Sequence, residues 1–214
     1  MKALFSDLKT SILLTLILIL LVCCAYPAAV WAGAQAFFKD KADGSLIVDA
    51  AGTVRGSALL AQNFSSDKYF QPRPSAAGTG YDATSSGGTN YGPTSDKLAN
   101  GSHAKDTKGK DVDDPGNFDG IKDLVAAYRT SNGLAADARV PADAVTRSAS
   151  GLDPHISTAN ALLQAARVAK ARKLPLATVQ ELIAEQTAGR GLGVLGEAGV
   201  NVLTLNLALD RKAP

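Results

Sequence analysis

The first stretch of the chain is dominated by one long hydrophobic run. Residues 10–38 include no charged side chain, and residues 12–25 are mostly Leu, Ile and Val. A helix of about 20 apolar residues is long enough to cross the roughly 30 Å hydrocarbon core of a bilayer. The pattern therefore predicts a transmembrane helix over residues 12–36, preceded by a short N-terminal segment (1–11) and followed by one domain (37–214).

A cleaved signal peptide is the alternative interpretation of this run. Lys2 and Lys9 precede the apolar residues, and the small residues of 34–36 (AQA) match a cleavage pattern. The run is longer than the apolar core of a usual signal peptide, which favours a retained anchor. Lys2 and Lys9 on one side are balanced by Lys39 and Lys41 on the other, so charge leaves the orientation open.

Beyond the run, short apolar segments alternate with polar turns. Residues 46–48 and 54–60 have the character of two strands joined by a turn at 49–52, which predicts a hairpin. Residues 75–120 are rich in Gly, Ser, Asn, Asp and Thr and contain few large apolar side chains. Such a segment cannot bury enough surface to form its own core, so we expect a long surface excursion.

Helical periodicity appears in the second half of the chain. Residues 121–128 place apolar side chains at helical spacing, with Asp119 as the expected cap and Gly133 beyond the end. A longer helix is expected from the capping residue Ser157 to about Lys173. Its predicted apolar stripe consists of Leu162, Leu163, Ala166 and Ala169.

The opposite face of this long helix carries Gln164, Arg167 and Lys170. A further helix should begin after Pro175 and stop at Gly189. Residues 200–209 alternate between apolar and other side chains, which predicts a closing strand. Strands at both ends of the domain with helices between them predict an α+β fold class.

Charge and cysteine content argue against several classes of function. The formal net charge is +2 and the two signs are interspersed, so we predict no nucleic-acid partner. The two cysteines, Cys23 and Cys24, lie inside the apolar run and leave the domain without a thiol for a disulfide or a zinc site. Residues 111–114 resemble part of a calcium loop, but Pro115 takes a ligand position and no Glu closes the loop, so we predict no metal site.

Two short motifs invite a chemical interpretation. Residues 191–196 match the glycine spacing of a dinucleotide fingerprint, but the expected order of helix and strand is the reverse of what that fingerprint needs, so we interpret them as a turn. Hydroxyl, carboxylate and imidazole groups lie close in sequence at Ser148, Ser150, Asp153 and His155. An anchored or secreted hydrolase using Ser150 and His155 is therefore the alternative function. A turn in which Asp153 and Ser157 accept hydrogen bonds from helix N-terminal amides explains the same residues.

Residues 67–74 (DKYFQPRP) combine aromatic, basic and amide side chains in a stretch stiffened by proline. The stretch is too polar to be predicted as core. Tyr and Arg are enriched at the centres of interfaces, and proline reduces the entropy lost on docking, so the segment suits a partner surface. A rigid loop packed on its own domain is the other interpretation.

Several long blocks follow one another along the chain: GSALLAQNFSSDKYFQPRPSAAG (56–78), SGGTNYGPT (86–94), VPAD (140–143), SGLDPHIS (150–157), Gln164 with ARVA (166–169), LGE (195–197) and VNVLTLNLALD (200–210). In this order they resemble the C subunit family of the Kdp potassium-transporting ATPases. The resemblance covers nearly the whole chain, including the N-terminal run. Residues 100–120 look like an insertion relative to shorter members, and we expect them to be flexible.

The resemblance implies a non-catalytic accessory subunit of a high-affinity, ATP-driven potassium import complex. It implies that the subunit assists assembly and raises the ATP affinity of the ATP-hydrolysing B subunit, acting as a catalytic chaperone. The implied partners are the membrane, a KdpA-like potassium-binding subunit and a KdpB-like P-type ATPase subunit. No cofactor is expected to bind tightly, and ATP is expected only through the complex.

The resemblance also implies a location and a set of candidate residues. The chain would lie in the cell inner membrane as a single-pass protein, with residues 1–11 cytoplasmic and the α+β domain (37–214) extracytoplasmic. The candidates for subunit contacts or nucleotide coupling are Asp67, Tyr69, Gln71, Arg73, Asp153, His155, Gln164 and Arg167.

Overall fold

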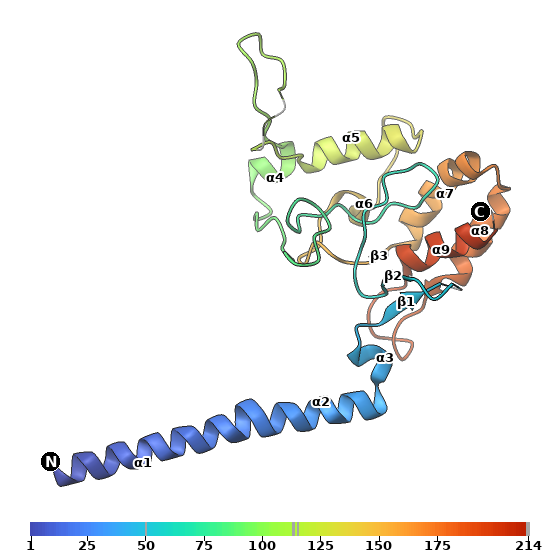
Figure 1. The fold of residues 1–214 in the computed structure, drawn as a ribbon. Coiled ribbons are helices and arrows are strands. Elements are labelled where there is room, and N and C mark those ends of the chain that lie inside the picture. The colour runs from blue at the N-terminus through green and yellow to red at the C-terminus, as the bar shows by residue number, and fades with distance from the viewer. Residues whose placement is uncertain (50, 113, 115, 213–214) are drawn as a thin grey trace. The chain divides into compact units, whose positions relative to one another are not determined.

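The computed structural model describes residues 1–49, 51–112, 114 and 116–212, and the chain divides into two compact units, Met1–Ser57 and Ala58–Pro214. The first unit contains α1 (Lys2–Leu18), the π-helix η1 (Ile19–Ala25), α2 (Tyr26–Phe37), α3 (Lys39–Ala42), β1 (Leu46–Val48) and β2 (Val54–Ser57). The second unit contains α4 (Asp96–Asn100), α5 (Ile121–Ser131), α6 (Ala142–Val145), β3 (His155–Ile156), α7 (Thr158–Arg172), α8 (Leu176–Glu185), β4 (Thr187–Ala188), β5 (Gly199–Asn201) and α9 (Val202–Lys212) (Figure 1).

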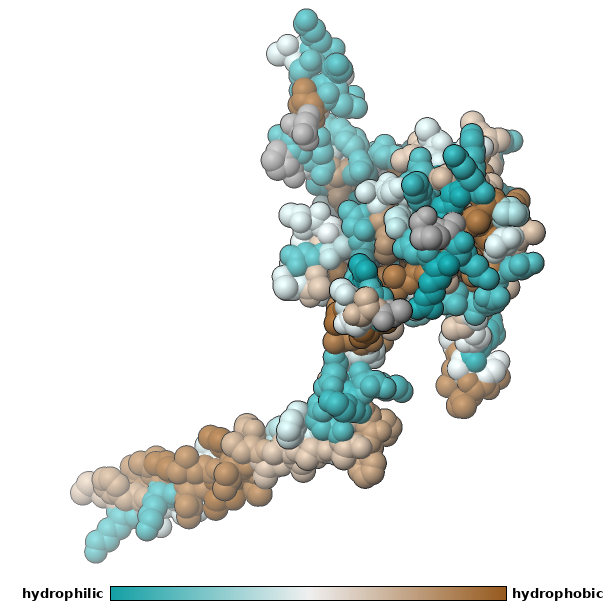
Figure 2. Space-filling model, turned by 45° about the vertical axis from the view of Figure 1, so that its right-hand side comes forward, coloured by the Kyte–Doolittle hydropathy of each residue, from teal (hydrophilic) through white to brown (hydrophobic). Residues whose placement is uncertain are grey.

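The first unit begins with an uninterrupted helix, Lys2–Phe37, made of α1, η1 and α2. It is 36 residues long, and its most apolar 18 residues have a mean hydropathy of 2.6 and are not buried in the protein. Figure 2 shows hydrophobic side chains, coloured brown, along most of its length. Among the described residues it is the one helix long and apolar enough to cross a membrane, which confirms the predicted apolar helix.

The predicted hairpin follows this helix within the same unit. β1 and β2 pair antiparallel, with Leu46 opposite Ser57 and Ile47 opposite Gly56. The second strand ends at Ser57 rather than at residue 60. Ala50, in the predicted turn, lies outside the described residues.

The core of the second unit is formed by three helices and a small sheet. Strands β3, β5 and β4 form an antiparallel sheet in that order, with His155 opposite Asn201 and Thr187 opposite Val200. Helix α7 packs against α8, and α8 packs against α9. The buried side chains are Phe70, Ile156, Ala161, Ala165, Val168, Ala169, Val179, Leu182, Ile183, Val200, Val202, Leu205 and Leu209. This arrangement confirms the α+β content.

A smaller apolar cluster forms where α5 meets α6. Tyr128, Ala144 and Val145 are its buried members. Helix α5 begins after Gly120, whose N–H donates to the Asp123 carboxylate at 2.9 Å. The prediction that Asp119 caps this helix is therefore wrong, because Asp123 reaches back from the first turn and satisfies the amide.

The face of α7 that is buried differs from the predicted one. Leu162 is 46% exposed, whereas Gln164 is 1% and Arg167 is 9% exposed. The predicted apolar stripe through Leu162 and Ala166 is wrong, and Gln164 and Arg167 point into the protein instead. The small residues Ala161 and Ala165 are fully buried on this face, and α7 packs there against α8 and β5. Side-chain size is therefore a poor guide to the buried face, because small residues let neighbouring elements approach closely.

The predicted closing strand at residues 200–209 is also wrong. Only Gly199–Asn201 is a strand, and the chain then turns directly into α9. Asn201 accepts a hydrogen bond from the N–H of Thr204 at 3.1 Å, which caps the helix. The preceding helix, α8, ends at Glu185 rather than at Gly189, because β4 takes up the next residues.

The polar excursion has more structure than its composition suggests. Helix α4 lies within it, and isolated antiparallel bridges join Ser102 to Phe118 and Lys105 to Asp111. The N–H of Gly87 donates to the carbonyl of Ser150 at 2.9 Å, which ties the excursion to the turn before β3. The flexibility of residues 100–120 stays a prediction, and residues 113 and 115 of the calcium-like sequence lie outside the described residues.

Candidate functional site

Two buried side-chain amides hold the backbone of the 67–74 segment. Asn206 of α9 accepts from the N–H of Phe70 at 2.8 Å and donates to its carbonyl at 2.9 Å. Gln164 of α7 accepts from the N–H of Gln71 at 2.8 Å and donates to its carbonyl at 3.0 Å. An amide offers a donor and an acceptor side by side, so each one pairs with a residue as a neighbouring strand would. We call Gln164, Arg167 and Asn206 the clamp.

Arg167 completes the clamp from the next turn of α7. Its guanidinium donates to the carbonyls of Asp67 at 2.8 Å and Tyr69 at 3.1 Å. It also donates to Asn132 at 3.0 Å and to Gln164 at 2.8 Å. Burial lowers the pKa of Arg167, and the Asp67 carboxylate opposes that effect. A cation buried among carbonyl oxygens rigidly fixes the segment that it contacts.

Phe70 anchors the same segment in the hydrophobic core. Its side chain is fully buried, and Pro72 is buried as well. The prediction that residues 67–74 are too polar for the core is therefore wrong for Phe70 and Pro72. Alternation along the segment explains this, because Phe70 and Pro72 are buried while Tyr69 and Gln71 are only half-buried.

Tyr69 is held by a charged pair at the edge of the segment. Its hydroxyl donates to the Asp210 carboxylate at 3.3 Å, and the Arg172 guanidinium lies 4.7 Å from the centre of its ring. Arg172 and Asp210 form an ion pair at 2.6 Å. The aromatic ring therefore has a fixed orientation at the surface.

The remaining candidates form a second group beside the clamp. Arg73 makes an ion pair with Asp153 at 2.9 Å and also donates to the carbonyl of Thr146. Asp153 accepts from the N–H of His155 at 3.0 Å, and its carboxylate lies 3.7 Å from the imidazole of that residue. The fold thus brings Arg73, from the 67–74 segment, next to Asp153 and His155.

The structure gives no support to a hydrolase using Ser150 and His155. The Ser150 hydroxyl accepts from the N–H of Leu152 at 3.1 Å and lies 3.4 Å from the Ser148 hydroxyl. No described hydrogen bond joins it to the imidazole of His155. A nucleophile needs its base within hydrogen-bond reach, so these residues are instead explained by the turn that precedes α7. Ser157 caps that helix as predicted, by accepting from the N–H of Asn160.

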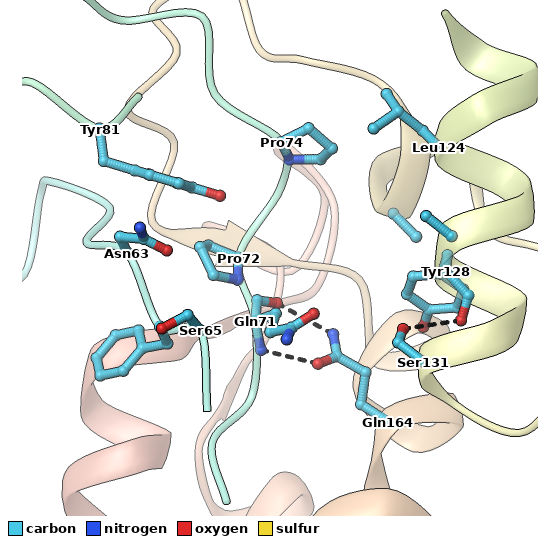
Figure 3. Close-up of a pocket in the computed structure, with 13 residues that line it drawn as sticks. Asn63, Ser65, Gln71, Pro72, Pro74, Tyr81, Leu124, Tyr128, Ser131 and Gln164 are labelled. Carbon is cyan, nitrogen blue, oxygen red and sulfur yellow. Dashed lines mark hydrogen bonds between the residues drawn. The ribbon is translucent and has the colours of Figure 1, made fainter. Parts of the chain in front are cut away.

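A pocket of about 380 Å³ lies beside the clamp (Figure 3). Figure 3 shows Tyr81, Pro72 and Pro74 on one side of it and Leu124 and Tyr128 on α5 on the other, with Gln71 and Gln164 hydrogen-bonded at its floor. Burial raises the pKa of Tyr81 to about 12, so the phenol is neutral at physiological pH.

The described residues that line this pocket include no charged side chain. A nucleoside triphosphate carries several negative charges, and phosphate sites rely on cations or on exposed backbone amides. The pocket therefore suits a neutral or apolar group better than a triphosphate.

One group of described side chains brings cation-ligand atoms together. Ligand atoms of His103, Asp119 and Asp123 all lie within 4.8 Å of one another. The imidazole of His103 lies 3.1 Å from the Asp123 carboxylate, which raises the pKa of His103 and lowers that of Asp123. The hydrogen bond between His103 and Asp123 and the cap of α5 by Asp123 account for this geometry, so it carries no metal assignment.

Sequence reasoning singled out Gln164 and Arg167 but missed Asn206, Asn132 and Asn160. These asparagines are all at most 8% exposed, and each bonds to a clamp residue or to the segment that the clamp holds. The available signal was the presence of Asn206 within an apolar run, because a polar residue on a buried helix face needs a partner.

Comparison with known proteins matches almost the whole chain to one family. Residues 8–211 match the family model described as "K+-transporting ATPase, c chain". A potassium-transporting ATPase KdpC subunit of Mycobacterium bovis is 50% identical over 186 residues, covering 87% of this chain and 88% of its own. The KdpC subunit of Rhodospirillum rubrum is 49% identical over 207 residues, covering 97% and 96%. That of a Caulobacter species is 47% identical over 210 residues, covering 98% and 95%.

An apolar N-terminal helix joined to a small α+β domain, together with these matches, defines a subunit of a membrane potassium-transporting ATPase. Within that class, the chain belongs to the KdpC family. The resemblance predicted from the sequence blocks is confirmed.

Proposed function

We propose that this chain is a single-span, non-catalytic subunit that assists assembly of the potassium importer and raises the ATP affinity of its ATP-hydrolysing subunit. The proposed partners are a KdpA-like potassium-binding subunit and a KdpB-like P-type ATPase. The second unit lies outside the cytoplasm in this proposal, held at the inner membrane by the Lys2–Phe37 helix.

The observation that carries the proposal is that Gln164 and Arg167 make their hydrogen bonds to their own chain. Gln164 makes hydrogen bonds to Gln71, Asn160 and Arg167, and Arg167 makes hydrogen bonds to four residues of its own chain. Groups that are fully engaged in this way hold a surface in shape rather than turn over a substrate. A rigid surface lowers the entropy lost on docking, which supports a role in assembly.

An effect on ATP affinity must then reach the ATPase through contacts between subunits. A domain outside the cytoplasm has no direct access to cytoplasmic ATP, so the coupling would be allosteric. Coupling free energies are reciprocal, so ATP binding should also tighten the association of this chain with the complex. ATP is accordingly a ligand of the complex in this proposal, with no tightly bound cofactor on this chain.

Detergent extraction with an affinity tag on this chain tests the proposal. The KdpA-like and KdpB-like subunits should co-purify, and the purified complex should show a lower KM for ATP than the same complex lacking this chain. A chain recovered alone and fully soluble would refute the proposal. The mass of the mature N-terminus distinguishes a retained helix from a cleaved signal peptide, for which cleavage is expected after Ala36.

The Arg73→Ala variant tests the role of the second group of candidates. Arg73 is partly exposed and paired with Asp153, so its loss should weaken co-purification of the partners while the domain still folds. Arg139→Ala, which removes an exposed arginine of the same unit, is the control and should behave as wild type. Unchanged co-purification of the Arg73→Ala variant would count against an interface role.

A further inference from the structure

The hairpin between β4 and β5 ends in an exposed cluster of aliphatic side chains. Leu192 is 91% exposed, Val194 is 73% and Leu195 is 62%. Residues 191–196 are all Gly, Leu or Val. In Figure 2 this hairpin is the projection at the lower right, and its tip is brown. We call residues 191–196 the apolar tip.

The backbone of the apolar tip pays a conformational cost to present these side chains. Leu192 has φ 51° and the adjacent Gly193 has φ 77°, so two successive residues are left-handed. Such turns normally carry Asn, Asp or Gly, because a bulky side chain is disfavoured at positive φ. A Leu that is strained and also exposed gains nothing from the fold of its own unit, which points to a function outside that unit.

Four backbone N–H groups of the apolar tip, those of Gly191, Gly193, Val194 and Leu195, donate to carbonyls within the hairpin. Gly191 and Leu195 exchange two backbone hydrogen bonds of 2.8 Å, and the N–H groups of Gly193 and Val194 donate to the carbonyls of Arg190 and Gly191. Arg190 and Glu197, on either side of the tip, form a double hydrogen bond of 3.0 and 2.8 Å with each other. A segment without charged side chains and with most of its N–H groups paired is suited to the interfacial layer, because unpaired backbone groups are costly in lipid.

The chain is physically tethered to a bilayer if the Lys2–Phe37 helix spans it, as proposed above. Residues 38–57 connect that helix to the second unit, and they span at most about 70 Å even when fully extended. The β1–β2 hairpin shortens this reach further, because it folds part of the connection back on itself. The length of this connection therefore limits how far the second unit can move from the bilayer surface.

We propose that the apolar tip inserts into the interfacial layer of the bilayer that the N-terminal helix spans, giving the second unit a second membrane contact. This inference rests on the membrane-spanning part of the proposed function. Lipid is favoured over a protein partner because protein hot spots are rich in Trp, Tyr and Arg and poor in Leu and Val. The tip is aliphatic throughout, and it is too short to do more than enter the interface.

Site-specific fluorescence on the full chain tests this inference. Cys23 and Cys24 are replaced by Ser, and a single Leu192→Cys is labelled with the environment-sensitive dye NBD. The chain is reconstituted alone into phosphatidylcholine vesicles. The label should emit at shorter wavelength than the same dye does in aqueous buffer. Its intensity should fall when the vesicles contain lipids with a nitroxide near the headgroup.

Two further labels separate the possible outcomes. Ile17→Cys reports on the helix, and Leu162→Cys reports on an exposed apolar position of α7. Quenching by nitroxide lipid at 17 and 192 but not at 162 supports the inference. Quenching at 17 alone overturns the inference and leaves the anchor intact, whereas no quenching at 17 or 192 overturns both.

A charged tip provides the second variant. Val194→Asp combined with Leu195→Asp should abolish the quenching at 192 and leave the quenching at 17 unchanged, because charge is costly in the interfacial layer and the helix is not altered. A shift at 192 that requires added partner subunits and is insensitive to nitroxide lipid would mean that the tip binds protein, and the inference would be wrong.

Discussion

Asn206 shows how a single side chain determines the position of a segment far from it in sequence. It lies on the buried face of α9 and is 1% exposed, yet both of its polar atoms are paired with the backbone of Phe70. Removing a partner from a buried donor or acceptor costs about 1–3 kcal/mol for each group left unpaired. A substitution of Asn206 by an apolar residue of similar volume should therefore still destabilise the fold.

We predict that Asn206→Leu lowers the free energy of unfolding by about 2 kcal/mol or more, because the N–H and carbonyl of Phe70 both lose their partners. Thermal unfolding of the full chain in detergent, followed by circular dichroism, measures the change. Asn63→Leu, at an exposed position, is the control and should change stability by no more than about 0.5 kcal/mol. Equal melting temperatures for the two variants would contradict the clamp.

Gln164 distinguishes a structural role from direct contact with nucleotide. In Gln164→Glu an oxygen replaces the NH₂ group that donates to the Gln71 carbonyl and to Asn160, so acceptors would face acceptors. We predict a loss of stability of about 2 kcal/mol or more, with any rise in the KM for ATP accompanying weaker assembly.

The matched control for that variant is Gln180→Glu on the exposed face of α8, which should leave stability and assembly unchanged. A Gln164→Glu chain that is as stable and as well assembled as wild type, but binds ATP more weakly in the complex, would show that Gln164 acts on nucleotide directly.

At the scale of the elements, α9 is the clearest difference between prediction and structure. Leucines at every second position from Leu203 to Leu209 fit a strand, but Val202, Leu205, Asn206 and Leu209 fit one face of a helix equally well. The hydrogen bond from Thr204 to Asn201 identifies the start of the helix. Short apolar patterns are ambiguous in this way because both periodicities are satisfied by the same residues.

A hydrogen bond between His103 and Asp123 joins the polar excursion to the start of α5, and both of its partners are titratable. The Asp123 carboxylate, hydrogen-bonded to His103, raises the pKa of the imidazole, and the same bond lowers the pKa of Asp123. A raised His pKa means that the contact stabilises the fold below the unfolded pKa of about 6.5 and is lost as the pH rises through the folded value. A lowered Asp pKa means that stability is lost again as the pH falls below about 4.

We therefore predict that the excursion is most protected from hydrogen exchange between about pH 4 and 6.5 and becomes less protected above that window. NMR titration of the His103 ring, together with amide exchange of residues 102–118, measures this. His103→Gln should remove the dependence above pH 6.5, and His155→Gln, at the other histidine, should not. Protection that rises with pH through the His103 transition would be the opposite of the expected sign.

At the scale of the whole molecule, the chain combines a long apolar helix with a second unit that contains no thiol. Both cysteines lie in the helix, at Cys23 and Cys24, so any cysteine introduced into the second unit is unique once these are replaced. This makes the sidedness of the unit directly measurable.

We predict that Leu162→Cys, in a chain with Cys23 and Cys24 replaced by Ser, reacts with a membrane-impermeant maleimide added to intact spheroplasts, because the second unit is proposed to lie outside the cytoplasm. Leu162 is 46% exposed, so it is accessible to the reagent. Asp7→Cys, before the apolar run, is the control and should react only after permeabilisation. The reverse pattern would place the second unit in the cytoplasm.

The sequence alone determined the features that depend on local composition and spacing. The apolar run is long enough to span lipid whatever follows it, the hairpin at β1 and β2 is bounded by turn residues, and Ser157 caps α7 because a hydroxyl before a helix satisfies a free N–H. The family followed from long blocks of matching residues, which require no knowledge of the fold.

Only the tertiary structure decided which face of α7 is buried, whether residues 202–209 are helix or strand, and which atoms Gln164 and Arg167 contact. Each depends on a segment distant in the chain: the backbone of Phe70 and Gln71 lies 136 and 93 residues from the amides that hold it. A buried amide destabilises the fold when it is unpaired and stabilises it when it is paired. The local sequence pattern does not indicate which distant residue will be its partner.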